Sequence, residues 1–441
     1  MAAALCLAAI LGALLLPGRW YLLSWLPFAV GARLVPRVDR RAALVLVLLG
    51  AVVLPLTAAS HPPDSSDDVY RYVWDGRVQL AGVDPYRYPP AAPELHRFRE
   101  PGLWPPSSHW CVADGCTLIN RPAVPTIYPP VAEAVFAGVV LLSPRSARQH
   151  PMQLAMALCA ALVGALLWRA LAALGRDPRR AVLWAWCPAV ALEAGNNAHV
   201  DVVAAGLAAA AVWVLAAGRR PALGGALLGL AVATKLTPAL LAPALLRRPP
   251  RPAAMVALCA AGALAVVYLP HVLAAGPAVL GYLPGYLHEE GYADGSRFAL
   301  LDVVLPPALA PVAAALIVAA TAVLAWRRAG PDRPWDTAAA TVTVTLLVAA
   351  PAYPWYTLLL VMLVGYGAPA EWLAVAPAAY LAQFAPDLGL ATATAQRTGY
   401  GLALLAIAAG LLRRRPRSLT PSRRVTGGGS WCRRSAAAWR R

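Results

Sequence analysis

Asp67 and Asp68 stand next to each other in a stretch of the sequence whose residue types are suited to acid–base chemistry. Tyr72 and Asp75 follow Asp68 at intervals of four and seven residues. This spacing places the three side chains on one face of a short helix that a preceding serine can cap. Neighbouring carboxylates repel each other, which can raise the pKa of one and make it a usable general base. A solvated helix start is the alternative interpretation, but the surrounding tyrosine, tryptophan and arginine residues make it the poorer one.

Lys235 is the single lysine among the 38 lysine and arginine residues of the chain. It lies in a short break, residues 234–238, between two apolar stretches, and the proline in that break is a natural helix breaker. An ammonium group there can bind a phosphate as a point charge. The alternative is a lysine that only extends its head group to the membrane surface. An ionisable group at membrane depth nevertheless indicates function by default.

Two further polar segments carry groups that can bind a substrate. The first contains amide, imidazole and carboxylate groups that bind hydroxyls: Asn197, His199 and Asp201. His199 can equally be an interfacial cap. The second surrounds His288 and Arg297, and is either part of a site or simply a solvated loop. Neither segment has a spacing that specifies a metal, and the chain has no glycine-rich phosphate loop. We therefore expect no cofactor, no indicated metal and no nucleotide substrate.

The composition defines the kind of structure that positions these residues. Of the 441 residues, 60% are hydrophobic and 13% are charged, and the mean hydropathy is +0.59. A soluble domain usually carries about twice that charged fraction. The charges are also clustered and leave long apolar runs between them. The sequence therefore predicts an all-α polytopic membrane protein, a bundle of about 12–14 transmembrane helices.

The net charge of +17 reflects arginine clusters at the ends of apolar runs. This is the positive-inside pattern and not the basic face of a nucleic-acid-binding protein. The cluster at 33–41 predicts a cytoplasmic turn, so the span 42–59 leads outward. The next cluster, at 176–180, must be cytoplasmic again, so only one of the two apolar stretches between them crosses. We expect 152–174 to cross and 127–143 to lie along the external interface.

This topology divides the chain into a transmembrane domain, residues 1–414, and a disordered basic cytoplasmic tail, residues 415–441. The domain has a long external loop at 60–151, with juxtamembrane helices, and a second external loop at 274–297. The first loop holds nine of the 21 acidic residues. The candidate residues are therefore expected to gather at the external face of the cell membrane.

Cys111 and Cys116 differ from the other five of the seven cysteines because they lie in the long polar loop. A disulfide between them is plausible if that loop is outside the cell, and two free thiols are the alternative.

The motifs of the first loop resemble those of GT-C glycosyltransferases. The chain reads Asp-Asp-Val-Tyr-Arg-Tyr-Val-Trp-Asp-Gly-Arg from Asp67, Gly-Val-Asp-Pro-Tyr from Gly82 and Tyr-Pro-Pro from Tyr128. It is most similar to the polyprenol-phosphate-mannose-dependent mannosyltransferases of actinobacteria, including glycosyltransferase family 87. Those enzymes have an acid at the start of this loop, a tyrosine four residues later and a downstream Tyr-Pro-Pro. The likeness covers residues 42–246 through its motifs and the rest mainly through topology.

The resemblance implies a reaction and roles for individual residues. Asp68 corresponds to the catalytic base, with Asp67 tuning or positioning it, and Lys235 binds the donor phosphate with help from Arg297. The acceptor hydroxyl loses its proton to the aspartate and attacks C1, which inverts that centre while the lipid phosphate departs. The implied partners are a polyprenyl-phosphate sugar donor, a glycolipid or glycan acceptor and membrane lipids, with no nucleic acid. Expected substrate-binding residues are Tyr72, Asp75, Tyr128, Asn197, His199, Asp201 and His288.

Two alternatives remain. Related mannosyltransferases often carry Gly-His-Asn-Asp where this chain reads Gly-Asn-Asn-Ala-His-Val-Asp from Gly195. A polyprenyl-phosphoarabinose donor therefore stays open beside mannose. A flippase for lipid-linked sugars is the competing class, but it would need polar groups distributed through the whole bilayer. The candidates crowd toward one surface, which favours a one-sided enzyme.

Overall fold

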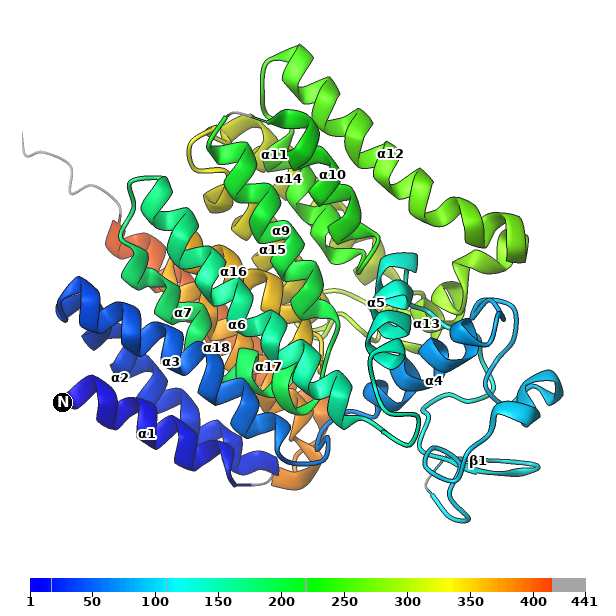
Figure 1. Ribbon diagram of the computed structural model, residues 1–441. Helices are drawn as coiled ribbons and strands as arrows, with labels where there is room; N and C mark the ends of the chain where they lie inside the picture. Colours follow the sequence, from blue (N-terminus) through cyan, green and yellow to red (C-terminus); the bar gives the residue numbers. More distant parts are fainter. Residues whose placement is uncertain (17, 109, 219, 415–441) are drawn as a thin grey trace, which may run out of the picture.

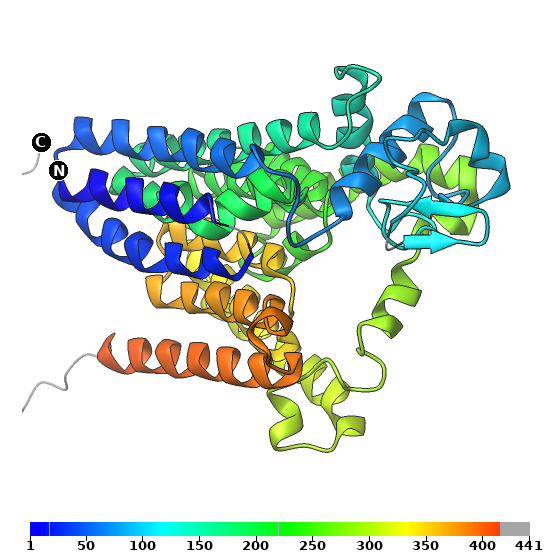
Figure 2. The ribbon, with the colours of Figure 1, turned by 90° about the horizontal axis from the view of Figure 1, so that it is seen from below.

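The computed structural model describes residues 1–16, 18–108, 110–218 and 220–414. The tail expected at 415–441 lies outside these described residues. The chain forms a bundle of helices with a smaller lobe of loops and short helices at one end (Figure 1). The turned view shows the lobe extending beyond the bundle (Figure 2). The predicted all-α fold of a polytopic membrane protein is confirmed.

The N-terminal helices pack side by side at one edge of the bundle: α1 (Ala2–Leu14), α2 (Trp25–Leu34) and α3 (Arg40–Ala59). Helix α3 begins where the Asp39 carboxylate accepts hydrogen bonds from the backbone N–H groups of Arg41 and Ala42. A helix of this length spans about 30 Å, which matches the hydrocarbon core of a bilayer.

The lobe is formed by the residues between α3 and α6. Its elements are α4 (Asp68–Leu80), strands β1 (Trp110–Val112) and β2 (Gly115–Thr117), and α5 (Pro130–Leu141). Helix α5 has 12 residues, about 18 Å, which is too short to cross a bilayer. It packs on α4 so closely that a Cβ at Gly76 would lie 2.7 Å from the carbonyl oxygen of Phe136. Its length fits the expected place along the interface, which stays a prediction.

The rest of the described chain builds the bundle. Its first part comprises α6 (His150–Ala173), α7 (Val182–Ala185), α8 (Pro188–Val190), α9 (Asp201–Ala216), α10 (Pro221–Val232), α11 (Ala242–Leu245) and α12 (Pro250–Ala275). Its second part comprises α13 (Leu283–Glu289), α14 (Ala310–Arg328), α15 (Pro334–Ala349), α16 (Leu358–Tyr366), α17 (Val375–Gln383) and α18 (Thr392–Arg414). Every residue of α16 is buried, as expected for a helix that is apolar on all sides. This helix lies at the centre of the bundle.

Two stretches of the chain run through the bundle as interrupted helices, and we call them the broken paths. One runs through α7, α8 and a π-helical turn, Ala191–Asn196. Here Gly195 touches α3, where a Cβ would lie 2.2 Å from the carbonyl oxygen of Pro55. The other consists of α10 and α11, separated at Lys235 and at the 3-10 turn Thr237–Leu241. π-Helical turns are rare and occur frequently at functional sites.

Among the described residues, four helices are long and apolar enough to cross a membrane, and five shorter ones are apolar. The two broken paths contain no helix of the length that this comparison requires. The count of 12–14 stays a prediction.

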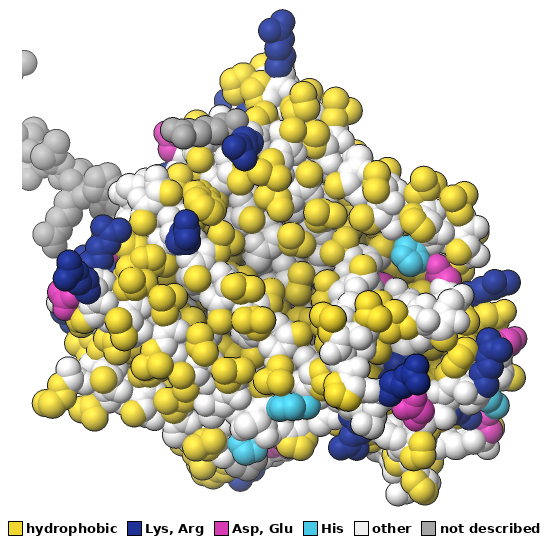
Figure 3. Space-filling view, viewed as in Figure 1, with side chains coloured by type: hydrophobic (Ala, Val, Ile, Leu, Met, Phe, Trp, Pro, Cys, Tyr) yellow, Lys and Arg dark blue, Asp and Glu magenta, His cyan; other side chains and the backbone are white. Residues whose placement is uncertain are grey.

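Arginines collect at the end of the bundle opposite the lobe. Arg179 donates to the carbonyl of Val38, and Arg180 donates to the carbonyl of Val364. Three more arginines line one hollow at this end: Arg220, Arg247 and Arg248. On the face of the molecule that Figure 3 draws, apolar side chains cover the middle and charged groups lie toward the ends. We call the two ends of the molecule the arginine end and the lobe end.

Candidate active site

A cavity of about 770 Å³ lies where the lobe meets the bundle. Four of the residues expected to form a site line it: Asp67, Asp68, Tyr128 and Lys235. Further walls come from the 120–129 segment, α13, the end of α15, the turn before α16 and residues 383–387, and Trp110 also lines the cavity. A cavity of this size is typical of a small-molecule site. Segments distant in the sequence therefore converge on one space.

Asp68 is the first residue of α4 and faces this cavity. The hydroxyl of Tyr128 donates to Oδ2 of Asp68 over 2.8 Å, and the side-chain amide of Asn120 donates to Oδ1 over 2.5 Å. The Asp68 side chain is 17% exposed. Its carboxylate is therefore held in a fixed orientation while part of it stays accessible. The expected helix start is confirmed, and the Ser66 hydroxyl accepts from the Asp68 backbone N–H over 3.3 Å.

The surroundings of Asp68 keep it ionised. Burial acts to raise the pKa of its carboxyl, but the Lys235 ammonium, the hydrogen bonds from Tyr128 and Asn120 and, when its ring is protonated, His199 bring the pKa below its ordinary value. The sequence argument expected repulsion between adjacent acids to raise a pKa. Opposite charge and hydrogen bonds dominate here instead, and Asp67 next to Asp68 is engaged by the Trp110 indole N–H over 2.8 Å.

Lys235 lies where α10 ends. Its Nζ is 3.1 Å from Oδ2 of Asp201, and both side chains are nearly buried. The ammonium also lies 5.2 Å from the ring centre of Tyr128 and 5.7 Å from that of Tyr356, which are cation–π distances. Asp201 therefore orients the lysine from behind, while two aromatic rings flank it at the cavity wall.

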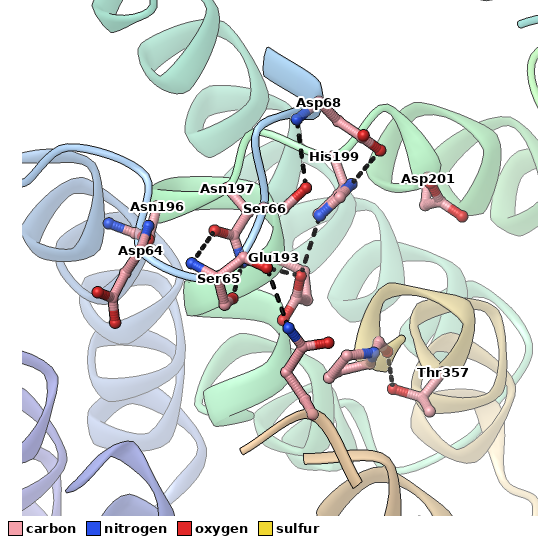
Figure 4. Close-up of polar contacts among 12 residues, drawn as sticks. Asp64, Ser65, Ser66, Asp68, Glu193, Asn196, Asn197, His199, Asp201 and Thr357 are labelled. Atoms are coloured by element: carbon pink, nitrogen blue, oxygen red, sulfur yellow. Dashed lines mark hydrogen bonds and ion pairs between the residues drawn. The ribbon is translucent and has the colours of Figure 1, made fainter. Parts of the chain in front are cut away.

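Residues 195–201 lie behind the cavity wall and connect the bundle to α4. The amide of Asn197 accepts from the Ser65 backbone N–H over 3.3 Å and donates to the Ser65 hydroxyl over 2.8 Å (Figure 4). Asn196 accepts from the backbone N–H of Asp64 over 2.9 Å. Asn197, expected to bind substrate, therefore holds the chain that leads into Asp68.

His199 is fully buried between two carboxyl groups. Its Nδ1 lies 3.8 Å from Oδ2 of Asp68, and its Nε2 lies 3.4 Å from Oε2 of Glu193 (Figure 4). The ring stacks on Trp355 with the two ring centres 4.0 Å apart. The structure thus brings His199 to the catalytic candidate and not to the cavity lining.

Tyr72 and Asp75, also expected to contact substrate, lie on parts of α4 outside the cavity lining. Tyr72 is buried and stacks on Phe136 at 4.2 Å, and its edge-on contact with Tyr128 is 5.0 Å. Asp75 is buried and paired with Arg71 over 3.0 Å. Tyr72 thus supports Tyr128 from behind, and Asp75 joins the packing between α4 and α5.

The second loop contributes aromatic rings. Tyr282, Tyr286 and Tyr292 line the cavity. Arg297 is buried, pairs with Glu290 and lies over the ring of Tyr353, outside the cavity lining. His288 is exposed at the end of α13 and also lies outside the lining. The structure therefore does not bring Arg297 or His288 to the wall that carries Asp68 and Lys235.

Strands β1 and β2 form an antiparallel hairpin closed by a disulfide between Cys111 and Cys116. The sequence left a disulfide and free thiols open, and the structure contains the disulfide. The hairpin begins with Trp110, which lines the cavity and binds Asp67. The covalent closure holds the segment that carries this indole.

Several residues of the site were missed from the sequence. Asn120 and Arg121 line the cavity, and the Arg121 guanidinium pairs with Glu289 over 2.8 Å. Glu193 lies inside an apolar run, and no spacing links it to His199 or Asp68. The aromatic run at 353–356 offered a signal, since Trp355 and Tyr356 both reach the site. No group of three or more metal-ligating side chains suited to a metal ion occurs among the described residues.

The family of the chain follows from its sequence. A family profile, glycosyltransferase family 87, matches residues 126–351. The chain belongs to glycosyltransferase family 87 and is a glycosyltransferase, as the motifs of the first loop indicated. A search of curated proteins gives no match.

Solved structures with a similar fold are distant in sequence. One is ArnT from Cupriavidus metallidurans bound to undecaprenyl phosphate, with 16% identity and a TM-score of 0.47 over 84% of this chain and 77% of that chain. Another is the archaeal oligosaccharyltransferase AglB from Archaeoglobus fulgidus in complex with an inhibitory peptide and a dolichol-phosphate. It has 13% identity and a TM-score of 0.44 over 84% of this chain and 54% of that chain. The chain therefore spans about half the length of AglB.

Proposed function

We propose that this protein transfers a sugar, mannose as the first candidate, from a polyprenyl phosphate to a hydroxyl of a glycolipid or glycan. One observation carries the proposal. Asp68 and Lys235 line the same cavity, and Tyr128 contacts both: its hydroxyl donates to Asp68, and its ring lies 5.2 Å from the ammonium. A carboxylate and a cation at one cavity provide the base and the phosphate-binding group that the reaction needs.

Asp68 is the general base of the proposal. Its lowered pKa keeps the carboxylate free of a proton at neutral pH, and its partial exposure leaves it open to an acceptor hydroxyl. The acceptor O–H bond breaks and the proton passes to Asp68. The acceptor oxygen attacks C1 of the sugar, and the C1–O bond to the phosphate breaks on the opposite side with inversion. The departing electron pair stays on the lipid phosphate.

Lys235 is the phosphate-binding group. The charge that builds up on the leaving phosphate needs a fixed cation, since electrostatic stabilisation usually contributes more to catalysis than any other single effect. Asp201 and the two flanking rings restrict the ammonium to one position. Arg297 was the second candidate, but its pairing with Glu290 favours a supporting role behind Tyr353.

The aromatic walls are suited to a sugar. Rings of Tyr282, Tyr286 and Trp355 offer flat apolar surfaces beside hydroxyl groups, and sugars present apolar faces edged by hydroxyls. Asp67 lies at the same wall with its indole partner. We propose that it orients the acceptor beside Asp68.

We propose that this site faces the extracytoplasmic side of the cell membrane. The arginine clusters lie at the opposite end of the bundle, and such clusters stay on the cytoplasmic side. The disulfide in the lobe also supports this orientation, because disulfides persist in the oxidising environment outside the cytoplasm.

The test is transfer by purified protein in liposomes. Polyprenyl-phosphomannose and polyprenyl-phosphoarabinose, each labelled in the sugar, are supplied with a membrane glycolipid fraction. We expect labelled glycolipid with the mannose donor and none with Asp68→Asn. If label were transferred only from the arabinose donor, the proposed sugar would be arabinose instead of mannose. Movement of intact donor between leaflets without transfer would support a flippase and overturn the proposal.

A further inference from the structure

Glu193 is a buried carboxyl inside the bundle to which the reaction proposed above gives no role. It lies in the π-helical turn Ala191–Asn196 and is 0% exposed. Burying an acidic group far from water is costly unless donors compensate it. Tyr380 donates to Oε1 over 2.5 Å, and Asn197 donates to Oε2 over 3.1 Å. Two donors therefore already converge on a carboxyl that faces His199.

The imidazole of His199 connects this carboxyl to Asp68. Its two nitrogens face the two acids, with Nε2 toward Glu193 at 3.4 Å and Nδ1 toward Asp68 at 3.8 Å. The ring is stacked on Trp355, so it cannot turn away easily. In Figure 4 the three side chains form one line from Glu193 through His199 to Asp68. The same arrangement of carboxylate, imidazole and reactive group serves to fix a tautomer in hydrolases.

The charge state of His199 makes its tautomer important. Burial lowers the pKa of His199 to about 3, so the ring is neutral and carries one N–H. Both carboxyl groups can accept from the ring, and the nearer acceptor, Oε2 of Glu193 at 3.4 Å against Oδ2 of Asp68 at 3.8 Å, favours the proton on Nε2. The lone pair of the neutral ring then lies on Nδ1, which faces Asp68.

We propose that Glu193 is a positioning residue that fixes the proton of His199 on Nε2, so that Nδ1 accepts a hydrogen bond from Asp68 once Asp68 has taken the acceptor proton. The inference rests on the proposed function. The present Nδ1–Oδ2 distance of 3.8 Å needs to shorten by about 1 Å to reach hydrogen-bond length. The proton stays on Asp68, shared with Nδ1, until the product leaves and water takes it up.

This arrangement strengthens Asp68 as a base. A lone pair facing the carboxylate disfavours its ionised form and stabilises its protonated form. Without it, the Lys235 ammonium, the Arg121 guanidinium and the hydrogen bond from Tyr128 would leave a weaker base. The other titratable groups that face Asp68 are Tyr72 and Asp201.

Glu193→Gln tests the tautomer directly. The Tyr380 hydroxyl makes the shorter of the two hydrogen bonds and keeps the amide oxygen at the Oε1 position, which turns the amide NH2 toward His199 and costs Asn197 its acceptor at the Oε2 position. The imidazole then accepts on Nε2 and carries its proton on Nδ1, toward Asp68. We expect kcat to fall roughly 100-fold or more, as when a positioned base is lost, with the donor KM unchanged. The acidic limb of the pH–rate profile should move to lower pH, because an N–H now stabilises ionised Asp68.

His199→Ala separates positioning from a structural role. If Glu193 acts only through His199, adding Glu193→Gln to His199→Ala lowers kcat no further. Glu371→Gln is the matched control, because Glu371 pairs with Arg414 at the arginine end, and it should leave the pH profile unchanged. Equal losses from Glu193→Gln in both backgrounds would overturn the inference. A Glu193→Gln profile identical to that of the unaltered protein would do so too.

A second variant keeps the test decisive if Glu193→Gln does not fold. Glu193→Asp retains the charge one methylene further from His199, so the tautomer and the acidic limb should be retained with a loss in kcat below about 10-fold. A shifted acidic limb in Glu193→Asp would contradict the inference. The unaltered protein and Asp68→Asn are assayed in parallel. No transfer by the unaltered protein would reject the proposed function, whereas activity lost in Asp68→Asn and kept in Glu193→Gln would reject this inference alone.

Discussion

The hydroxyl of Tyr128 donates a hydrogen bond of 2.8 Å to Oδ2 of Asp68. The two residues are sixty positions apart in the chain. One starts helix α4, and the other precedes α5. Their contact makes the packing of these two helices a condition for the orientation of the carboxylate. Any change that separates α4 from α5 is therefore expected to impair Asp68 as well.

Replacing the carboxylate of Asp68 tests its role as the base. Asp68→Asn keeps the size of the side chain but removes the basic lone pair, so transfer should fall at least ~100-fold. Donor binding and the amount of folded protein should change little. Asp67→Asn is the adjacent control and should cost clearly less, because neighbouring residues of a helix point in different directions. If the two variants exchanged ranks in a transfer assay, the base would be Asp67.

Lys235→Ala tests the phosphate contact. Losing a charge-assisted contact in a site of low dielectric should weaken donor binding or slow transfer roughly 10- to 1,000-fold. Lys235→Arg should restore only part of this, since a planar fork replaces a point charge. Arg247→Ala is the control, because Arg247 also lies over an aromatic ring, that of Trp326, but at the arginine end. Normal kinetics for Lys235→Ala would show that the lysine does not bind the donor and only extends its head group to the membrane surface.

The pH dependence follows from the lowered pKa of Asp68. The carboxylate is the active form, so activity should persist into acid and fall only as the pH drops through that lowered pKa. Tyr128→Phe removes a hydrogen bond to the charged form, so the pKa should rise and the acidic limb should move to higher pH. Tyr366→Phe removes an equally buried hydroxyl that donates to Ala209 in the bundle, and it should leave the limb in place. An unmoved limb in Tyr128→Phe would show that another group controls it.

The orientation of the molecule is tested by thiol labelling. Ser107→Cys adds a thiol at an exposed position of the lobe, and a membrane-impermeant reagent should label it in intact cells. A parent chain with Cys111 and Cys116 replaced provides the background. Gly330→Cys is the matched control at the arginine end, where an added Cβ meets nothing within 4 Å. It should react only after permeabilisation, and the reverse pattern would place the cavity inside the cell.

The sequence identified the parts of the site that are encoded locally. The start of α4 at Asp68 was predictable from helix spacing, and Lys235 from its being the single lysine. The family motifs added Tyr128. The role of Asn197 was not predictable, because its amide binds Ser65, which is far away in the chain. The resemblance assigned Arg297 to the donor phosphate. Its pairing with Glu290 and its position behind Tyr353 could not be read from the sequence, because they depend on tertiary packing.

The fold also divides into features that local sequence encodes and features that tertiary packing decides. Composition predicted a helical membrane bundle because apolar length is a local property. The broken paths at Ala191–Asn196 and Lys235 have no equally simple signal. There, contacts between helices decide the backbone, as at Gly195 against Pro55. Glu193 was missed because an acid inside an apolar run acquires its partners only when the helices pack.

The wall of the cavity is built from residues that run from Asp64 to Asp387 in the chain. A ribosome must therefore deliver most of the protein into the membrane before the last wall segments exist. Until then, Asp68 is synthesised without Lys235, and later without Tyr356. Nascent chains that stop before α16 should be inserted but unable to act on the donor. We therefore expect the enzyme to become reactive only when its insertion is nearly complete.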